Sequence, residues 1–355
     1  MDLYAVIMAG GVGARFWPRS KEKKPKQLLK IFGQNSMIQD TINRLEGLVE
    51  KQNIYIVTNK IQKTEIKNQL PEIPVENIID EPFGKNTAAA IGLASIIIGK
   101  RNKEAVILTL PADHIIKEKD EFQNTLKKAA EFAYSKRGLV TIGINPTRPE
   151  TGYGYIQIDE KPVEDNIFKV LTFAEKPNYA TAVRFIESGD FLWNSGMFIW
   201  RIDSIMNEIS IHMPELFEGL QEIEGSVNTP GFEKTLSHVY GQLKSISIDY
   251  GVMEKSENVY LTRGVFSWSD VGSWEEVYQL TEKDDDGNAV VGKTYCQNTS
   301  DSYIYSPKKF TAVVGVENLI VINTEDALLI CRRDKAQEVK NVVDYLKMKK
   351  LSEHL

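Results

Sequence analysis

The stretch that decides the fold runs from Leu3 to Gln27 and reads LYAVIMAGGVGARFWPRSKEKKPKQ. Its first six residues are an apolar run of the kind that forms a strand buried on both faces. Three glycines follow, Gly10, Gly11 and Gly13, and after them come several basic residues. Because glycine lacks a Cβ atom, such a loop can bring its N–H groups close to phosphate oxygens. The stretch therefore predicts a buried strand followed by a phosphate-binding loop.

The loop matches neither of two well-known phosphate-binding motifs. It has no Gly-Lys-Ser/Thr of a Walker A loop, and Phe16 stands where a Rossmann fingerprint needs its third glycine. It does carry two cations suited to phosphate, the planar fork of Arg15 and the compact charge of Lys26. A glycine-rich turn beside solvated lysines is the alternative interpretation. The coincidence of a strand, three glycines and two spaced cations favours phosphate binding.

Further apolar runs alternate with helical patterns through the first half of the chain. The expected strands are Ile54–Thr58, Ala105–Leu110 and Leu139–Gly143, and the expected helices are Ser36–Gly47, Lys60–Gln69, Thr87–Lys100 and Glu118–Ser135. This alternation predicts an α/β fold, with a Rossmann-like, mixed but mainly parallel sheet flanked by helices. In such sheets ligands bind beyond the carboxyl ends of the strands. The loops that follow the strands are therefore where we expect the chemistry.

One of those loops reads Leu110-Pro-Ala-Asp-His114 and places Asp113 directly after a buried strand. A carboxylate at that edge could hold Mg²⁺ against phosphates bound by the first loop. Asp113 could equally be a capping residue of the next turn, and this motif alone does not decide between the two. We expect His114 to be structural, because a neutral imidazole is a poor Mg²⁺ ligand.

The last part of the chain has a different pattern of residues. We place a catalytic domain in residues 1–285 and a small β-rich domain in residues 286–355. The second domain should contain short strands and a closing helix, predicted at Val313–Val316, Leu319–Asn323, Ala327–Cys331 and about Lys335–Lys349. A β-helix would suit this pattern, but the spacing is too irregular to identify a repeat.

Composition excludes several classes of protein. With 43 basic and 49 acidic residues the net charge is −6, which argues against general affinity for nucleic acid or a membrane surface. No apolar stretch approaches the ~20 residues that span a bilayer. Two cysteines cannot form a disulfide framework, so we expect a cytoplasmic protein. Only four histidines are present, so a metal would be held by carboxylates, which favours Mg²⁺.

Taken together, seven ordered motifs resemble those of the sugar-1-phosphate nucleotidyltransferases, and most closely those of the mannose-1-phosphate guanylyltransferases. The resemblance covers nearly the whole chain. The motifs are GGVGARFWPRSKEKKPKQ, LPADH, TGYGYI (Thr151–Ile156), EKP (Glu175–Pro177), WNSGMF (Trp193–Phe198), SIDYGVMEK (Ser247–Lys255) and WSDVGSW (Trp268–Trp274).

The resemblance implies a role for particular residues. Arg15, Lys26 and Asp113 would be catalytic, and Asp113 with Asp270 would hold Mg²⁺. The nucleotide-binding residues would be Ala9, Gly10, Gly11, Gly13, Arg15, Glu81, Asn86 and Thr87. The residues that bind the sugar phosphate would be Gly152, Glu175, Lys176 and Asn194.

The resemblance also implies a reaction, the transfer of a nucleotidyl group from GTP to α-D-mannose 1-phosphate, giving GDP-mannose and pyrophosphate. Guanine selectivity is not visible in the spacing of the residues, so a thymidylyl-, adenylyl- or uridylyltransferase acting on glucose 1-phosphate is the nearest alternative. A non-catalytic nucleotide-sugar sensor should have lost Arg15, Lys26 or the carboxylates, and all are present. A glycosyltransferase should have an Asp-x-Asp motif, whereas His114 and Ile115 follow Asp113.

Three further expectations concern packing and assembly. We expect Trp193, Trp268 and Trp274 to be packing residues, since aromatic side chains are usually buried. Asp249 and Glu254 read as solvated or capping charges. Apolar residues on one face of the closing helix suggest a homodimer. These residues are Val339, Val342, Val343 and Leu346.

Overall fold

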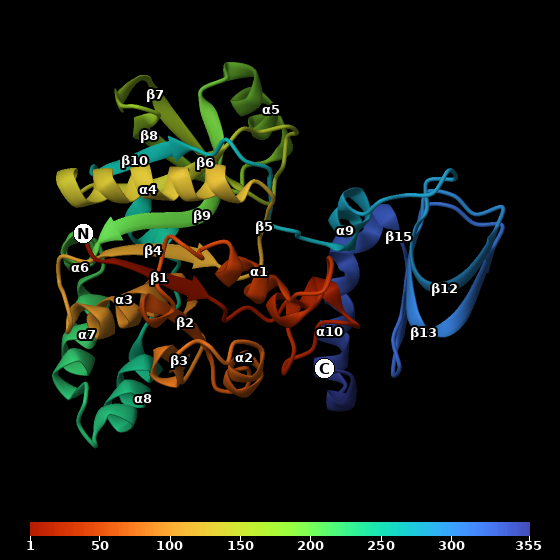
Figure 1. Ribbon diagram of the computed structural model, residues 1–355, viewed down its shortest axis with the longest axis horizontal. Helices are drawn as coiled ribbons and strands as arrows, with labels where there is room; N and C mark the ends of the chain where they lie inside the picture. Colours follow the sequence, from red (N-terminus) through yellow and green to blue (C-terminus); the bar gives the residue numbers. More distant parts are fainter.

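The computed structural model describes residues 1–355, and its centre is a nine-stranded sheet (Figure 1). In order across the sheet, the strands are β3 (Ile78–Glu81), β2 (Ile54–Asn59), β1 (Leu3–Met8), β4 (Val106–Pro111), β9 (Phe191–Arg201), β6 (Leu139–Ile144), β10 (Val259–Arg263), β8 (Ile167–Glu175) and β7 (Gly154–Glu164). Strands β1 to β4 are parallel, and β9 runs antiparallel to both β4 and β6. The predicted α/β class, with a mixed sheet flanked by helices, is confirmed.

Strand β1 matches the predicted bounds, β2 and β6 each extend one residue further than predicted, and β4 is shifted by one residue at both ends. Strand β1 is recognisable in the sequence because both of its faces are buried. Ala5 and Ile7 belong to one hydrophobic core, while Tyr4 and Val6 belong to the core on the opposite face of the sheet. An uninterrupted apolar run is the consequence of this two-sided burial.

Helices cover both faces of the sheet (Figure 1). One core includes side chains of α1 (Met37–Asn43), α2 (Lys63–Gln69) and α4 (Lys119–Lys136). The core on the other face includes side chains of α3 (Asn86–Gly99), α6 (Ile202–His212), α7 (Pro214–Ser226) and α8 (Phe232–Gln242). Helix α5 (Tyr179–Ser188) contributes Ala182 to the first of these cores.

The predicted helix Ser36–Gly47 is shorter in the structure. Ser36 is its N-cap and forms a capping box with Gln39, and α1 then ends at Asn43. The next residues form turns, which bring Leu45 and Val49 into the core. The apolar pattern continues beyond the end of α1 because Leu45 and Val49, in the turns that follow, pack in the same core as the helix.

Two short strands connect parts of the chain that are distant in the sequence. Strand β5 (Ile115–Ile116) pairs antiparallel with β11 (Trp268–Ser269), with Ser269 opposite Ile115. The helix α9 (Trp274–Leu280) follows. This pairing joins the segment after β4 to the WSDVGSW segment, which lies more than 150 residues away in the chain.

The residues from Ala289 onward form a separate four-stranded sheet that projects from the rest of the molecule (Figure 1). Its strands are β12 (Ala289–Gln297), β13 (Tyr303–Val314), β14 (Leu319–Asn323) and β15 (Leu328–Arg332), of which only β15 is antiparallel to its neighbour. The sequence predicted β14 correctly and β15 within one residue, but it missed β12 and most of β13. Many side chains of those two strands are exposed, so the apolar pattern is weak there.

The closing helix begins later than predicted. Residues Arg333–Val339 form a 3₁₀ segment, the helix α10 is Lys340–Met348, and a last 3₁₀ turn covers Ser352–His354. Of the face proposed for a dimer, Val339, Val343 and Leu346 are buried within the chain, against a cluster that includes Trp17. That part of the prediction is wrong, because intramolecular packing already covers this face.

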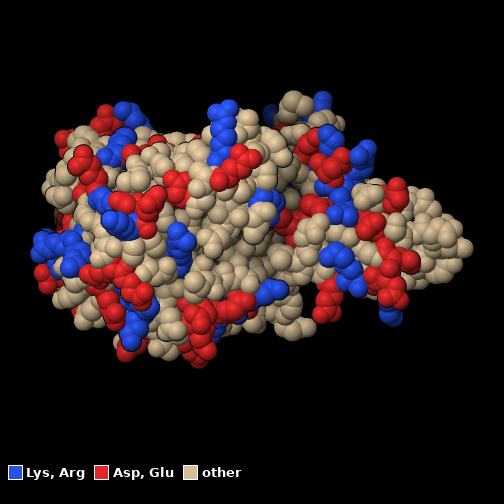
Figure 2. Space-filling model, turned by 90° about the horizontal axis from the view of Figure 1, so that it is seen from above, with Lys and Arg blue, Asp and Glu red and all other residues tan.

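No helix of the protein has both the length and the apolar character needed to cross a membrane. On the face drawn in Figure 2, Lys and Arg side chains lie among Asp and Glu side chains instead of forming a continuous basic surface.

Candidate active site

The segment after β1, residues 9–27, is called the glycine loop below. It folds back on itself so that Gly13 lies close to Ser20 and Lys26. Gly13 has a left-handed backbone, with φ of 59°, and begins the 3₁₀ turn Ala14–Phe16. A Cβ atom at this position would lie 2.8 Å from Lys26 Cβ and 2.9 Å from Ser20 Oγ. Both the backbone conformation and the close approach therefore require glycine here.

Gln27 holds the first part of the loop from behind. Its buried side chain donates hydrogen bonds from Nε2 to the carbonyl oxygens of Ala9, at 2.7 Å, and Gly11, at 3.0 Å. This residue was missing from the predicted site, although it directly follows Lys26 in the loop motif. Its contacts orient the backbone on which Gly10 and Gly11 lie.

Lys26 connects the loop to both predicted metal ligands. Its Nζ atom lies 2.8 Å from Asp113 Oδ2 and also donates to the main-chain oxygen of Asp270. The Lys26 side chain is 6% exposed, whereas that of Asp113 is 34% exposed. Burial by itself would raise the pKa of Asp113, but the charge of Lys26 outweighs this effect and the pKa lies below its ordinary value. Asp113 is therefore held as a carboxylate.

Pairing of β5 with β11 explains why these three residues meet. Asp113 precedes β5 and Asp270 follows β11, so the two-stranded ribbon brings both segments to the edge where β1 and β4 end. Tyr153 donates a hydrogen bond from its hydroxyl group to Asp270 Oδ1. Burial, with the nearby Asp270 charge, raises the pKa of Tyr153 well above its ordinary value, so this hydroxyl keeps its proton. The sequence contained Tyr153 in the GYGY motif but did not mark it as a partner of Asp270.

His114 has the structural character that we expected. Its Nδ1 atom accepts a hydrogen bond from Trp268 Nε1 at 3.1 Å, and the two rings pack edge to face. Burial lowers the pKa of His114 to about 4, so the imidazole is neutral at physiological pH. Trp193 and Trp274 are buried, which agrees with their predicted packing role, whereas Trp268 is half-buried and also lines a cavity beside the site.

Arg15 is placed differently from Lys26. It lies on the 3₁₀ turn after Gly13, and its side chain is exposed, with no hydrogen bond or ion pair to the rest of the protein. The structure thus brings Lys26, Asp113 and Asp270 together but not Arg15. Its guanidinium group is free to meet a ligand outside the loop.

Beside these residues lies a cavity of about 280 Å³ that contains much of the predicted sugar site. Five predicted residues line it, namely Thr87, Gly152, Glu175, Asn194 and Asp270. Asp249 also lines it, and this residue was wrongly interpreted as a solvated or capping charge. Asp249 Oδ1 accepts a hydrogen bond from Asn194 Nδ2 at 2.7 Å, and burial raises the pKa of its carboxyl group.

Glu175 reaches this cavity from the end of β8. A Cβ atom on Gly154 would lie 2.4 Å from Glu175 Oε2, so a larger residue here would force this carboxylate to move. Lys176 forms an ion pair with Glu175, but its side chain is exposed and does not line the cavity. Glu175 and Gly154 thus both line the cavity, and Lys176 lies outside it.

The residues predicted to read the nucleotide do not gather at one place: Glu81 lies beside Gly10, whereas Thr87 lines the cavity that also contains Glu175. Glu81 is 8% exposed at the end of β3, and a Cβ atom on Gly10 would lie 3.8 Å from its Oε2 atom. Burial raises the pKa of Glu81 to about 7, and its Oε1 atom has no hydrogen-bond partner. Asn86 is exposed with a φ of 66°, and Thr87 accepts a hydrogen bond from the Ile248 N–H at 2.8 Å.

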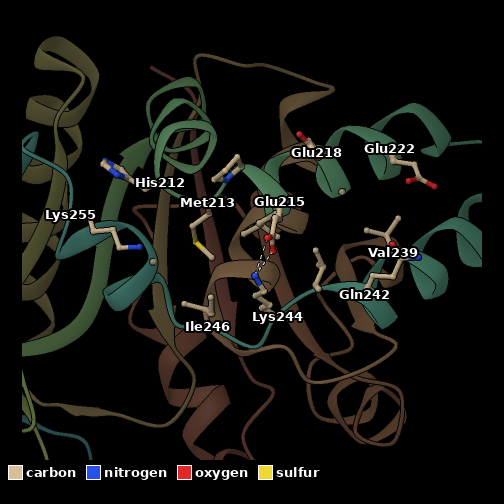
Figure 3. Close-up of a pocket in the computed structure, with 15 residues that line it drawn as sticks. His212, Met213, Glu215, Glu218, Glu222, Val239, Gln242, Lys244, Ile246 and Lys255 are labelled. Carbon is tan, nitrogen blue, oxygen red and sulfur yellow. Dashed lines mark hydrogen bonds and ion pairs between the residues drawn. The ribbon is translucent and has the colours of Figure 1, made fainter.

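A second cavity, of about 500 Å³, lies among the helices α6, α7 and α8 (Figure 3). Lys244 and Glu215 pair across it at 2.8 Å, and His212 and Met213 contribute to its wall. None of the predicted site residues lines this cavity, so it is separate from the candidate active site.

Comparison with known proteins shows a family match for each of the two parts of the chain. The model of the family described as nucleotidyl transferase matches residues 4–287, and that of the MannoseP isomerase/GMP-like beta-helix domain matches residues 296–346. Mannose-1-phosphate guanylyltransferase from Escherichia coli is 38% identical over 99% of this chain and 77% of its own length. The protein of the same name from Salmonella muenchen is 40% identical, over 99% of this chain and 75% of its own.

A solved structure extends the likeness to three dimensions. The crystal structure of mannose-1-phosphate geranyltransferase from Thermus thermophilus superposes with a TM-score of 0.89 at 33% identity, and covers 98% of this chain and 100% of that chain. The chain therefore belongs to the nucleotidyl transferase family, within the group of mannose-1-phosphate guanylyltransferases.

Proposed function

We propose that the protein transfers a guanylyl group from GTP to α-D-mannose 1-phosphate and releases GDP-mannose and pyrophosphate. The observation that carries this proposal is the contact of Lys26 with both Asp113 and Asp270, beside a cavity lined by Glu175 and Asn194. That arrangement combines a cation, two carboxylates and a pocket for hydroxyl groups. The guanylyltransferases that resemble this chain over 99% of its length supply the reaction.

The main obstacle in this reaction is the repulsion between two polyanions. The nucleophile is a phosphate oxygen that is already ionised at neutral pH, so the reaction requires no general base. Catalysis therefore depends on positioning and on stabilising charge in the transition state. In our proposal the N–H groups of Gly10, Gly11 and Gly13 hold the triphosphate, while Arg15 and Lys26 neutralise the charge of the reacting phosphate and of the departing pyrophosphate.

The donor set of this site suits Mg²⁺. Both carboxylates, Asp113 and Asp270, belong to segments that contact the Lys26 ammonium group, and the lowered pKa of Asp113 keeps it ionised. No group of three or more His, Cys, Asp or Glu side chains gathers as a metal site in the protein. Mg²⁺ in phosphoryl-transfer enzymes is commonly held by one or two carboxylates together with substrate phosphates. We propose that Asp113 and Asp270 hold Mg²⁺, which would neutralise phosphate charge and align the two substrates.

The sugar phosphate has matching partners in the cavity. Carboxylate and amide groups accept and donate hydrogen bonds to hydroxyl groups, so Glu175 and Asn194 suit a sugar ring. In our proposal the backbone at Gly152 contacts the sugar as well, and Lys176 faces its phosphate from the cavity edge. Asp249 orients the Asn194 amide through its 2.7 Å hydrogen bond.

Guanine recognition is assigned in our proposal to Glu81, which lies beside Gly10. Guanine presents two donors, N1–H and the N2 amine, and a carboxylate is the acceptor that suits both. Glu81 is buried beside Gly10, where a Cβ atom would lie 3.8 Å from its Oε2 atom, and this placement supports the role. The backbone at Ala9 and the side chains of Asn86 and Thr87 would then contact the base and ribose.

One assay tests the reaction and its selectivity. Pyrophosphate release is measured for GTP, ATP, UTP and dTTP, each combined with mannose, glucose and N-acetylglucosamine 1-phosphates. We expect the highest kcat/KM for GTP with mannose 1-phosphate. A higher value for dTTP, ATP or UTP with glucose 1-phosphate would refute the guanylyl assignment, and no release with any pair would refute the transferase itself.

Three accompanying predictions concern the protein as a whole. We propose a boundary between domains 1–285 and 286–355 and a homodimer, for which a light-scattering mass of two chains is the test. The dimer contact must lie outside the buried face of α10. Cys296 and Cys331 are free thiols, which supports the proposed cytoplasmic location.

A further inference from the structure

The middle of the glycine loop is held by the C-terminal part of the chain. Trp17 donates a hydrogen bond from Nε1 to the His354 carbonyl oxygen at 2.9 Å. Its side chain is 9% exposed and packs in a cluster that includes Val339, Val343 and Leu346 of the closing helical segments. A residue two positions from Arg15 is therefore anchored by the last residues of the protein.

Two further contacts lie on the same side of the loop. The Arg19 guanidinium carbon lies 4.1 Å from the centre of the Tyr305 ring on β13. Lys21 forms an ion pair with Asp326, which lies between β14 and β15. Residues Trp17, Arg19 and Lys21 thus all point to the C-terminal sheet or its helix.

Phe16 links these contacts to the catalytic lysine. Its buried ring packs against Trp274 with centroids 5.0 Å apart, and Trp274 stacks on Tyr303 of the C-terminal sheet at 5.9 Å. On its other side, the Lys26 Nζ atom lies 5.4 Å from the centre of the Phe16 ring. The C-terminal sheet is therefore connected to Lys26 through two aromatic rings, and to Arg15 through the adjoining backbone.

We infer that the C-terminal part of the chain is a positioning element for the catalytic loop, and that Tyr305 and Asp326 hold Arg15 and Lys26 in their reactive placement. Arg15 has no contact of its own that would fix it, so its position depends on the anchored residues that follow it. A misplacement of about 1 Å can cost up to a hundredfold in rate. Tyr305 and Asp326, which are at least 279 positions away in the sequence, thus contribute to catalysis without touching the substrates.

The test uses the full-length chain with a Tyr305→Leu/Asp326→Asn double variant. Tyr305→Phe retains an aromatic ring under Arg19 and serves as the conservative variant. Tyr295→Leu changes an exposed tyrosine on β12 and is the matched control. Asp326→Asn alone, at a side chain that is 43% exposed, keeps the test available if the double variant folds poorly.

Amide hydrogen exchange of peptides covering residues 10–27 is the first measurement, because it does not depend on the proposed function. We expect faster exchange there in the double variant, with unchanged exchange in the Asp249–Met253 turn. The second measurement is turnover, where we expect about a tenfold loss in kcat/KM for the nucleotide and little change in KM for the sugar phosphate. Tyr305→Phe and Tyr295→Leu should behave as the unmodified protein.

Two results would overturn the inference. One is unchanged exchange of the loop in a folded double variant, and the other is faster exchange with turnover within twofold of the unmodified protein. If the unmodified protein releases pyrophosphate from no substrate pair, the proposed function fails, while the exchange measurement still decides whether the loop is held in place.

Discussion

Replacing Lys26 by methionine removes the charge at the centre of the site while keeping a side chain of similar length. In the structure this ammonium group is almost fully buried and lies 2.8 Å from Asp113 Oδ2. A buried, preorganised charge that stabilises a transition state contributes about 3 kcal/mol, which corresponds to roughly a hundredfold in rate. We therefore expect Lys26→Met to lower kcat about a hundredfold.

The same substitution leaves Asp113 without its partner, so stability must be separated from catalysis. Breaking a fully buried ion pair costs about 3–5 kcal/mol. Here the Asp113 side chain is 34% exposed, and water can partly replace the lysine. We expect a loss of about 1–2 kcal/mol in the free energy of unfolding, which leaves the protein folded at 25 °C.

The assay is single-turnover formation of the nucleotide sugar at saturating substrates, with thermal unfolding measured in parallel. Lys23→Met is the matched control, because Lys23 lies in the same loop but is exposed and makes no ion pair. We expect the control to keep near-normal turnover. A folded Lys26→Met protein with turnover within threefold of the unmodified protein would show that the contact with Asp113 and Asp270 is structural only.

Three other changes are expected to have distinct effects. The pKa of Glu81 is about 7, above the ordinary 4.5, so the folded state keeps the proton longer than the unfolded state and stability falls as pH rises from about 4.5 to 7. Urea unfolding at pH 5 to 8 should show a flatter pH dependence in Glu81→Gln, and an unchanged slope would contradict the assignment of the pKa. Gly154→Ala would place a methyl group 2.4 Å from Glu175 Oε2, so we expect a KM for mannose 1-phosphate raised about tenfold with an unchanged KM for GTP, measured by initial rates. Asp249→Ala removes the acceptor of the Asn194 amide and should raise the KM for mannose 1-phosphate by a similar factor. Asp249→Asn keeps an oxygen acceptor and should raise this KM less. Equal effects of the two variants would show that the charge of Asp249 matters more than its hydrogen bond.

The positions of β1, β2, β4 and β6 and the first loop were predictable because their causes are local. A strand buried on both faces must be apolar throughout, and β1 shows this with Tyr4 and Val6 in one core and Ala5 and Ile7 in the other. The glycine at position 13 is required by a left-handed backbone within the same loop. Such features can be predicted because the residues that cause them lie within a few positions of one another in the sequence.

Residues whose role comes from distant partners left a weaker signal. Asp249 looked like an ordinary helix charge, and only the fold places it against Asn194 and in the cavity. Tyr153 and Gln27 were visible in their motifs, but their acceptors, Asp270 Oδ1 and the carbonyl oxygens of the glycine loop, are not identified by spacing. The apolar face of the closing helix was interpreted as a sign of a homodimer, but its partner is the same chain.

The sequence alone therefore determined the α/β class, the strand that leads into the glycine loop, and the family to which the motifs point. Tertiary structure decided which charges share a site, because only the β5–β11 pairing brings Asp270 to Lys26 and Asp113 across more than 150 residues. It also decided that the C-terminal residues contact the glycine loop. Contacts of this kind depend on three-dimensional distance, which side-chain type and spacing along the chain do not encode.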